Sequence, residues 1–302
     1  MVTLTRNHPV DAPCRYISSL PSKGIRSSFI EALNQWFMIK SESLDVIKDI
    51  IKMLHDVSLI LDDIQDDSPL RRGRPPTPST YLFVQALADV HGHFDAVTNG
   101  AFIEVLQRMH VGQGYDMYWS FHSQCPSEQE YLEMVDGKTG AMFALVVTLM
   151  ESKSATMPRG DSFQRLTLLF GRFFQVRDDF MNLNSELYAQ GKGFCEDLDE
   201  EKLSYLLIVC AKSDPDAYQQ IMGIFRARSS SPTGAATPLA RESKTYILSL
   251  LELSGTMKAT KAWLLHLESE IVAEIGALEK AHGKKNAQFR MLVSKLSVKS
   301  TE

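Results

Sequence analysis

Apolar residues recur along most of the chain at the spacing of a helix that buries one face. Between residues 44 and 61 they follow the order i, i+3, i+4, i+7, which predicts one long helix. The same period returns in segments 29–39, 81–90, 98–110, 128–152, 162–183, 202–211, 216–226, 243–252, 257–277 and 287–296. Sustained period-2 alternation, which is typical of strands, is rare. The sequence therefore predicts an all-α protein.

Proline and glycine stand between these segments rather than inside them. Four prolines crowd one predicted loop between residues 69 and 78. Residues 228–241 are rich in serine, threonine and proline and cannot bury apolar area, so we expect a mobile loop there. No repeat of fixed period and no break in composition divides the chain. The sequence therefore predicts a single domain over residues 1–302.

Composition and charge narrow the classes of function. The chain has 32 lysine and arginine residues against 37 acidic ones, so it lacks the basic excess that nucleic-acid binding needs. It contains no uncharged apolar run of about 18 residues, as a membrane span requires. Its four cysteines lie far apart, without the spacing of a zinc site or a disulfide framework. We expect a soluble, cytoplasmic protein with no nucleic-acid partner.

Two acidic clusters of equal spacing carry the candidate chemistry. Each has polar side chains at positions i, i+1 and i+4 after an apolar helical run: Asp62, Asp63 and Asp66 in the first, and Asp178, Asp179 and Asn182 in the second. Carboxylates one turn apart share a helix face and repel, so a cation is expected nearby. Oxygen ligands without histidine or cysteine favour Mg²⁺. Either cluster alone is more often a solvated helix end, but the pair favours a diphosphate held through metal ions.

Cationic and polar residues occur where a diphosphate would need them. The candidates are Lys23, Arg26, Arg71, Arg72, Lys138 and Thr139. His55 lies on the same helix face as Asp62, two turns earlier. Residues 137–140 lack the P-loop pattern, so nucleotide hydrolysis is not indicated. Taken singly, His55 is more often a core histidine, and Arg71 and Arg72 are more often solvated. Only their grouping with the clusters indicates a site.

Seven motifs, in this order, resemble those of the trans-prenyltransferases, specifically the eukaryotic geranylgeranyl diphosphate synthases. They are Leu20–Arg26, Leu54–Asp66, Leu70–Gly73, His110–Asp116, Lys138–Gly140, Phe173–Asp179 and Phe194–Leu198. The resemblance implies an antiparallel helical bundle of the isoprenoid synthase type around a deep apolar cavity, in a homodimer or higher oligomer. It also implies Mg²⁺-dependent condensation of isopentenyl diphosphate with dimethylallyl, geranyl or farnesyl diphosphate to give geranylgeranyl diphosphate.

The same resemblance assigns roles to individual residues. The catalytic carboxylates would be Asp62, Asp63, Asp66, Asp178 and Asp179, with Asp62, Asp66 and Asp178 as ligands in a site for three Mg²⁺ ions. Isopentenyl diphosphate would bind to Lys23, Arg26, His55 and Arg72, and the allylic diphosphate to Arg71, Lys138, Thr139, Gln175, Lys192 and Lys202. Val57 and Ser58 occupy the positions where bulky aromatic residues stop growth at fifteen carbons, so a twenty-carbon product is expected.

The chain also departs from the pattern that it resembles. Ser22, Ala141 and Glu201 stand where glycine is usual, and a short segment after Pro78 is missing. Two alternatives therefore stay open. One is a catalytically weak partner subunit, and the other is a class I terpene cyclase, although residues 182–186 lack the spacing of a cyclase's second metal motif.

Overall fold

The computed structural model describes residues 24–65, 80–157, 159–160, 162–184, 194–229 and 237–299. Its elements are α2 Ile25–Phe37, α3 Ser41–Gln65, α4 Thr80–His93, α5 Ala96–His122, α6 Glu128–Val135, the π-helix η2 Asp136–Gly140, α7 Ala141–Lys153, α8 Gln164–Asn184, α10 Glu196–Asp199, α11 Tyr205–Ser213, α12 Pro215–Ser229, α13 Arg241–Leu253, α14 Thr256–His282 and α15 Ala287–Leu296. No strand occurs in these residues, so the all-α prediction is confirmed.

Several predicted residues lie outside the described part of the chain. They are Lys23, Asp66, Arg71, Arg72 and Lys192, and the side chain of Asp63 is likewise not described. The loop predicted at residues 228–241 is shorter at both ends, because α12 continues to Ser229 and α13 begins at Arg241. None of the described helices is both long and apolar enough to cross a membrane.

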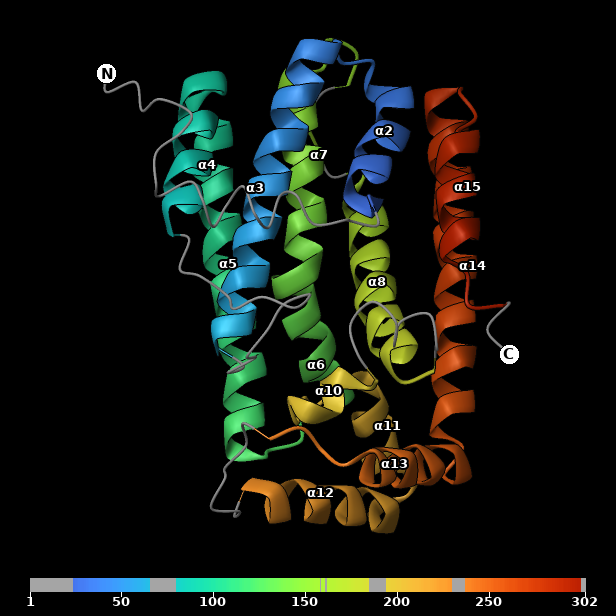
Figure 1. Ribbon diagram of the computed structural model, residues 1–302. Helices are drawn as coiled ribbons and strands as arrows, with labels where there is room; N and C mark the ends of the chain where they lie inside the picture. The colour runs from blue at the N-terminus through green and yellow to red at the C-terminus, as the bar shows by residue number, and fades with distance from the viewer. Residues whose placement is uncertain are drawn as a thin grey trace.

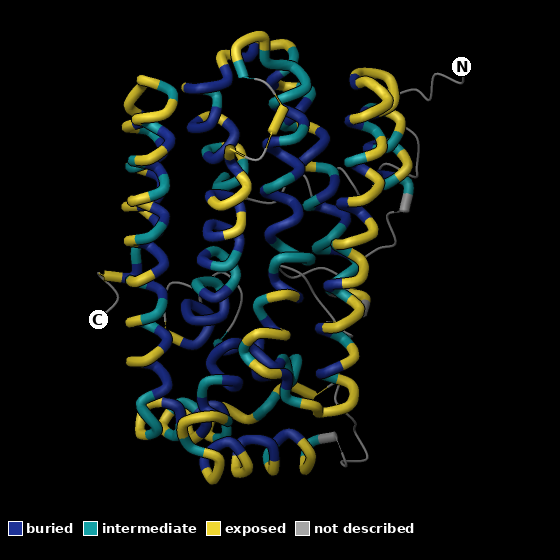
Figure 2. The backbone as a smooth tube through the Cα atoms, turned by 180° about the vertical axis from the view of Figure 1, so that it is seen from behind, coloured by how far each residue is buried: buried dark blue, intermediate teal, exposed yellow. Residues whose placement is uncertain are grey.

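The long helices α3, α4, α5, α7, α8, α14 and α15 run alongside one another, with α2 among them, and α12 and α13 lie across one end (Figure 1). The short α10 and α11 sit near that same end. Figure 2 shows the buried residues on the inner faces of these helices and the exposed ones outside. This one-sided burial is what the helical period of the sequence predicts.

Aromatic side chains tie the first described helix to the last. The ring of Phe29 on α2 lies 4.9 Å from Phe143 on α7, 4.8 Å from Phe170 on α8 and 5.2 Å from Phe289 on α15, measured between centroids. All four side chains are fully buried. Offset and edge-on pairs at these separations add to the free energy gained from burial alone. This aromatic cluster packs α2, α7, α8 and α15 together, and α7 and α8 flank the π-helix that carries part of the polar site described next.

Candidate active site

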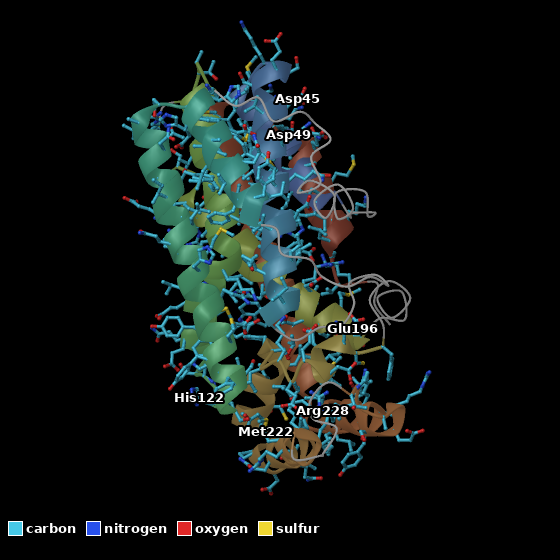
Figure 3. All side chains as sticks on the ribbon, turned by 60° about the vertical axis from the view of Figure 1, so that its left-hand side comes forward. Asp45, Asp49, His122, Glu196, Met222 and Arg228 are labelled. Atoms are coloured by element: carbon cyan, nitrogen blue, oxygen red, sulfur yellow. The ribbon has the colours of Figure 1, made fainter. Side chains whose placement is uncertain are left out.

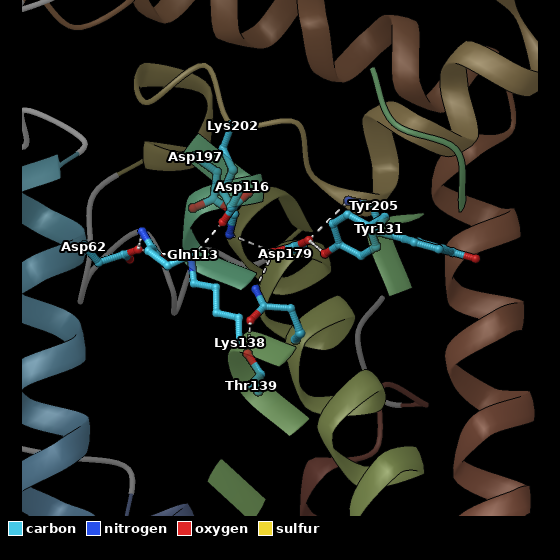
Figure 4. A network of polar contacts seen from close by, with 11 residues as sticks. Asp62, Gln113, Asp116, Tyr131, Lys138, Thr139, Asp179, Asp197, Lys202 and Tyr205 are labelled. Carbon is cyan, nitrogen blue, oxygen red and sulfur yellow. Dashed lines mark hydrogen bonds and ion pairs between the residues drawn. The ribbon is translucent and has the colours of Figure 1, made fainter. Parts of the chain in front are cut away.

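Polar groups of α3, α5, α6, η2, α8, α10, the turn after α10 and the start of α11 meet in one network (Figure 4). A small pocket of about 30 Å³ opens onto it, lined by Asp62, Gln113, Asp116, Met117, Ser120, Lys138, Glu200 and Lys202. The network thus brings Asp62 of the first acidic cluster together with residues that are far from it in the sequence.

The π-helix η2 interrupts the helix that the sequence predicts at residues 128–152, and it carries two of the predicted residues, Lys138 and Thr139. A Cβ atom on Gly112 of α5 would lie 2.7 Å from the backbone nitrogen of Lys138. A Cβ atom on Gly171 of α8 would lie 2.6 Å from the Cα atom of Gly140. Both helices therefore approach η2 as closely as backbone allows, and only glycine fits at these two contacts. Single π turns inside helices recur at functional sites.

Lys138 joins η2 to the first acidic cluster. Its Nζ atom lies 2.7 Å from Asp116 Oδ2 and 3.1 Å from Asp62 Oδ1, and Gln113 Nε2 donates a further 2.9 Å hydrogen bond to Asp62. Burial by itself lowers the pKa of Lys138, but the two carboxylates outweigh it and raise that pKa above the ordinary value. Burial would raise the pKa of Asp62, yet Lys138 and Lys202 lower it overall. Ammonium and carboxylate therefore stay ionised at neutral pH.

Asp179 of the second cluster is fully enclosed by donors. Its Oδ1 atom accepts hydrogen bonds from Lys202 Nζ at 3.0 Å and Gln175 Nε2 at 3.1 Å, and Oδ2 accepts from the Tyr131 hydroxyl at 2.5 Å and the Tyr205 backbone at 3.2 Å. The side chain has no exposed surface. These bonds compensate the cost of burying its charge. In this arrangement Asp179 holds Lys202 and Tyr131 in place.

Lys202 and Thr139 complete the network around the second cluster. Burial lowers the pKa of Lys202, but Asp179, Asp197 and Asp116 raise it well above its ordinary value, so its ammonium stays charged. The Thr139 hydroxyl donates a 2.7 Å hydrogen bond to Gln175 Oε1. Four residues predicted for the allylic diphosphate, Lys138, Thr139, Gln175 and Lys202, therefore lie in one connected group.

Two residues predicted for isopentenyl diphosphate, Arg26 and His55, contact each other. Arg26 Nη1 lies 2.9 Å from His55 Nε2, and because arginine can only donate, the histidine nitrogen accepts. The guanidinium also lies 5.6 Å from the ring centroid of Phe174. Burial lowers the pKa of Arg26 to about 10, although Asp178 and Asp56 act in the opposite direction. Because the charge of Asp178 acts on the pKa of Arg26, the Arg26–His55 pair lies near the second acidic cluster.

The predicted chain-length residues differ in their surroundings. Val57 is buried and packs on Leu82 of α4, with Met53, Leu61 and Phe83 around them. Ser58 is half-buried, and its hydroxyl donates a 2.9 Å hydrogen bond to the backbone oxygen of His55. Substitution at Ser58 therefore disturbs less packing than substitution at Val57. Their effect on product length stays a prediction, as does the deep apolar cavity.

Five further residues belong to the network although the sequence did not assign them a role. Gln113, Asp116 and Asp197 stand inside motifs noted in the sequence, so a signal for them existed. Tyr131 and Tyr205 gave no signal, because each contacts Asp179 only through the packing of α6 and α11 near α8. The tertiary contact alone identifies both tyrosines.

The oxygen-only donor set fits a hard cation such as Mg²⁺. Among the described residues, no group of three or more acidic, histidine or cysteine side chains is gathered closely enough to hold one. Asp66 and the side chain of Asp63 lie outside that part of the chain. The predicted ligands Asp62, Asp66 and Asp178 therefore stay a prediction.

Nearly the whole chain is similar to part of several named fungal proteins. It is 50% identical over 302 residues to the sesterterpene synthase btcA of Neocamarosporium betae, covering 96% of this chain and 41% of that protein. It is 43% identical over 301 residues to the preterpestacin I synthase tpcA of Cochliobolus heterostrophus, with 96% and 42% covered. The bifunctional terpene synthase FUP1 of Fusarium proliferatum is 41% identical over 305 residues, with 97% and 40% covered. The chain thus spans about two fifths of the length of these relatives.

These names bear on the resemblance drawn from the sequence. The relatives are called terpene synthases rather than geranylgeranyl diphosphate synthases, so they support the terpene-synthase alternative better than the original interpretation. The coarser part of that resemblance is confirmed. Residues 7–237, which are most of the chain and include every residue of the network above, match the polyprenyl synthetase family, and the chain belongs to that family.

Proposed function

We propose that this chain condenses isopentenyl diphosphate with allylic diphosphates and provides the linear product that a terpene synthase cyclises. The observation that carries the proposal is the polar network, in which two half-buried, charged lysines, Lys138 and Lys202, are paired with carboxylates of α3 and α8. Such a site suits a diphosphate leaving group rather than a neutral substrate. The chain's length relative to its relatives, two of which carry "bifunctional" in their names, supports a division of labour within a longer protein.

The expected product is longer than the sequence alone suggested. Several relatives are named sesterterpene synthases, and sesterterpenes contain twenty-five carbons. We therefore propose a twenty-five-carbon diphosphate as the main product in place of the twenty-carbon one. The small side chain of Ser58 is consistent with either length, because it places no bulk on that face of α3.

The chain's own residues account for the charge that such a reaction develops. Lys138 and Lys202 keep their protons at neutral pH and offer fixed positive charge to the departing diphosphate. Asp116 retains Lys138 when Asp62 binds a ligand, since it is a second partner at 2.7 Å. We expect Arg26, which contacts His55, to bind the second diphosphate. Mg²⁺, bound by Asp62, Asp66 and Asp178, would supply further neutralisation of the diphosphate. No protein nucleophile is required.

The test is product analysis of the purified chain. It is incubated with Mg²⁺, isopentenyl diphosphate and, in turn, dimethylallyl, geranyl and farnesyl diphosphate, and the dephosphorylated products are separated by chain length. We expect linear alcohols with twenty-five carbons as the longest abundant species. A main product of twenty carbons would instead support the interpretation as a geranylgeranyl diphosphate synthase. Cyclic hydrocarbons formed by this chain alone would favour the class I cyclase, and the absence of any product would favour the weak partner subunit.

Two substitutions test the carboxylates separately from the fold. Asp62→Ala and Asp178→Ala should each lower turnover by at least a hundredfold, about 2.7 kcal/mol of transition-state stabilisation. Asp45→Ala, at the opposite end of α3 (Figure 3), is the matched control and should retain turnover. Turnover of either site variant within tenfold of wild type would refute the metal assignment.

We further propose that two copies of the chain associate through α5. Six of its large apolar side chains are exposed, namely Val97, Ile103, Val111, Tyr115, Tyr118 and Phe121. If two α5 helices cross in antiparallel about Gln107, Ile103 of one copy faces Val111 of the other, and Glu104 faces His110. Such self-complementarity is what a two-fold interface needs.

Sedimentation velocity tests this interface. Val111 is 59% exposed, and Val111→Glu would place a charge in the apolar contact, so the variant should sediment as a monomer. Met291→Glu, at a 70% exposed position on α15, should leave the wild-type dimer intact. A monomeric wild-type chain, or equal sedimentation of both variants, would refute the α5 interface.

A further inference from the structure

The backbone turn that presents Lys202 is a helix C-terminal motif with an unusual residue in it. Lys202 N–H donates to the Asp197 carbonyl oxygen at 3.1 Å, and Glu201 N–H donates to the Leu198 carbonyl oxygen at 3.4 Å. These two bonds form the Schellman motif, which terminates α10 and requires a left-handed residue between the helix and Lys202. That residue is Glu201, with φ of 51°.

Glutamate is a costly choice at this position. Glycine is usual there because a side chain in the left-handed region costs about 1–2 kcal/mol. The described residues contain only three other non-glycine residues with positive φ, none of which adjoins a residue of the polar network on its C-terminal side. An L residue retained in this conformation, next to Lys202, points to an interaction of its side chain that glycine could not make.

Arg228 near the end of α12 makes that interaction. Its Nε and Nη2 atoms both lie 3.0 Å from Glu201 Oε1. The Arg228 side chain is 8% exposed and that of Glu201 is 19% exposed, so the pair is largely removed from water. Figure 3 shows Arg228 at the end of the molecule where α10 to α13 gather. Breaking an ion pair that is largely removed from water destabilises the segment that it holds.

A second buried cation, Lys244 of the next helix, contacts residues at both ends of α10. Lys244 of α13 donates to the carboxylate of Asp199 and, at 2.7 Å, to the Phe194 carbonyl oxygen. The backbone nitrogen of Leu239 donates to Asp199 at 2.8 Å. The short α10 is therefore fixed from outside the polar network at both of its ends, and four residues are too few to hold their own position.

We propose that Glu201 and Arg228 are a positioning pair, which fixes the left-handed turn after α10 and thereby the Lys202 ammonium against Asp179. The inference rests on the proposed function for the role of Lys202 in binding the allylic diphosphate. Their side chains contact each other through the 3.0 Å ion pair. Glu201 adopts the left-handed conformation that glycine would adopt more easily. Unlike glycine, it also links the turn to α12 through its ion pair with Arg228.

The test compares Arg228→Met with the double variant Glu201→Gly/Arg228→Met. Arg228→Met should raise the Michaelis constant for the allylic diphosphate about tenfold, because Glu201 loses the ion pair with Arg228 that holds the strained turn. The Michaelis constant for isopentenyl diphosphate should stay within about twofold of wild type. Glycine adopts the left-handed turn without strain, so the double variant should return to within about threefold of wild type. Arg165→Met, which breaks an exposed ion pair with Glu270, is the matched control.

Amide hydrogen exchange gives a readout that does not depend on activity. In Arg228→Met the amides of Glu201 and Lys202 should exchange about tenfold faster, and in the double variant and in Arg165→Met at the wild-type rate. If the wild-type chain forms no prenyl product, the proposed function fails, while the exchange rates still decide the positioning pair. Unchanged exchange in Arg228→Met, or a double variant as impaired as the single one, would overturn the inference.

Discussion

The close approach of α5 to the π-helix yields a sharp prediction for Gly112→Ala. The new Cβ atom would lie 2.7 Å from the Lys138 nitrogen, 3.0 Å from the Met134 oxygen and 3.1 Å from the Gly137 carbonyl carbon. All three are backbone atoms, so no side chain can rotate away. Ordinary contact begins at 3.4 Å, and α5 and η2 must therefore separate by about 0.7 Å at the closest point.

Two opposing terms set the size of the effect. Forcing an extra carbon into a packed contact costs about 1–3 kcal/mol. Alanine in place of glycine within a helix returns about 1 kcal/mol. Gly223→Ala in α12 isolates the second term, because its Cβ atom would meet nothing within 4 Å. The free energy of unfolding of Gly112→Ala should therefore lie about 1–3 kcal/mol below that of Gly223→Ala.

Urea unfolding followed by tryptophan fluorescence measures this difference. The displaced contact includes Lys138 itself, so kcat/KM for the allylic diphosphate should also fall, by up to about a hundredfold for a shift approaching 1 Å. Gly223→Ala should leave kcat/KM unchanged. Equal stability of the two alanine variants, or full activity in Gly112→Ala, would show that α5 and η2 yield at this contact and that the packing argument is wrong.

Three further outcomes follow from other contacts. Tyr131→Phe removes a 2.5 Å hydrogen bond to the buried Asp179 and should cost about 1.5–3 kcal/mol of unfolding free energy, measured in urea, and a loss below 0.5 kcal/mol would contradict it. Ser58→Phe should shorten the main product by at least one five-carbon unit, and chromatography showing an unchanged length distribution would refute the role of that face of α3. Hydrogen bonding from Arg290 lowers the pKa of Glu279 to about 2, below its unfolded value of 4.5, so this contribution to stability is present above pH 4.5 and lost as the pH falls toward 2. Acid titration of the unfolding midpoint should therefore show a smaller loss over that range in Glu279→Gln than in wild type.

Much of this protein could be predicted from the order of its residues. The helical period located α3 and α8. Apolar residues recur along the buried face of a helix whichever neighbour covers that face. The polar residues of one helix, such as Asp178 and Asp179, are placed relative to each other by the same geometry. Motifs whose residues are close in sequence were therefore visible without a structure.

The contacts between helices could not be predicted in this way. Tyr131 meets Asp179 across 48 positions of the chain, and Arg26 meets His55 across 29. The period of a helix states which face is buried but not which neighbour covers it, and that depends on how all the helices pack together. Glu201 shows the same limit, since the sequence marked it only as a departure from glycine, whereas its partner on α12 became visible in the fold. The sequence thus determined the elements and the local clusters, and the tertiary structure decided which charges neutralise one another, because that choice depends on distance in space.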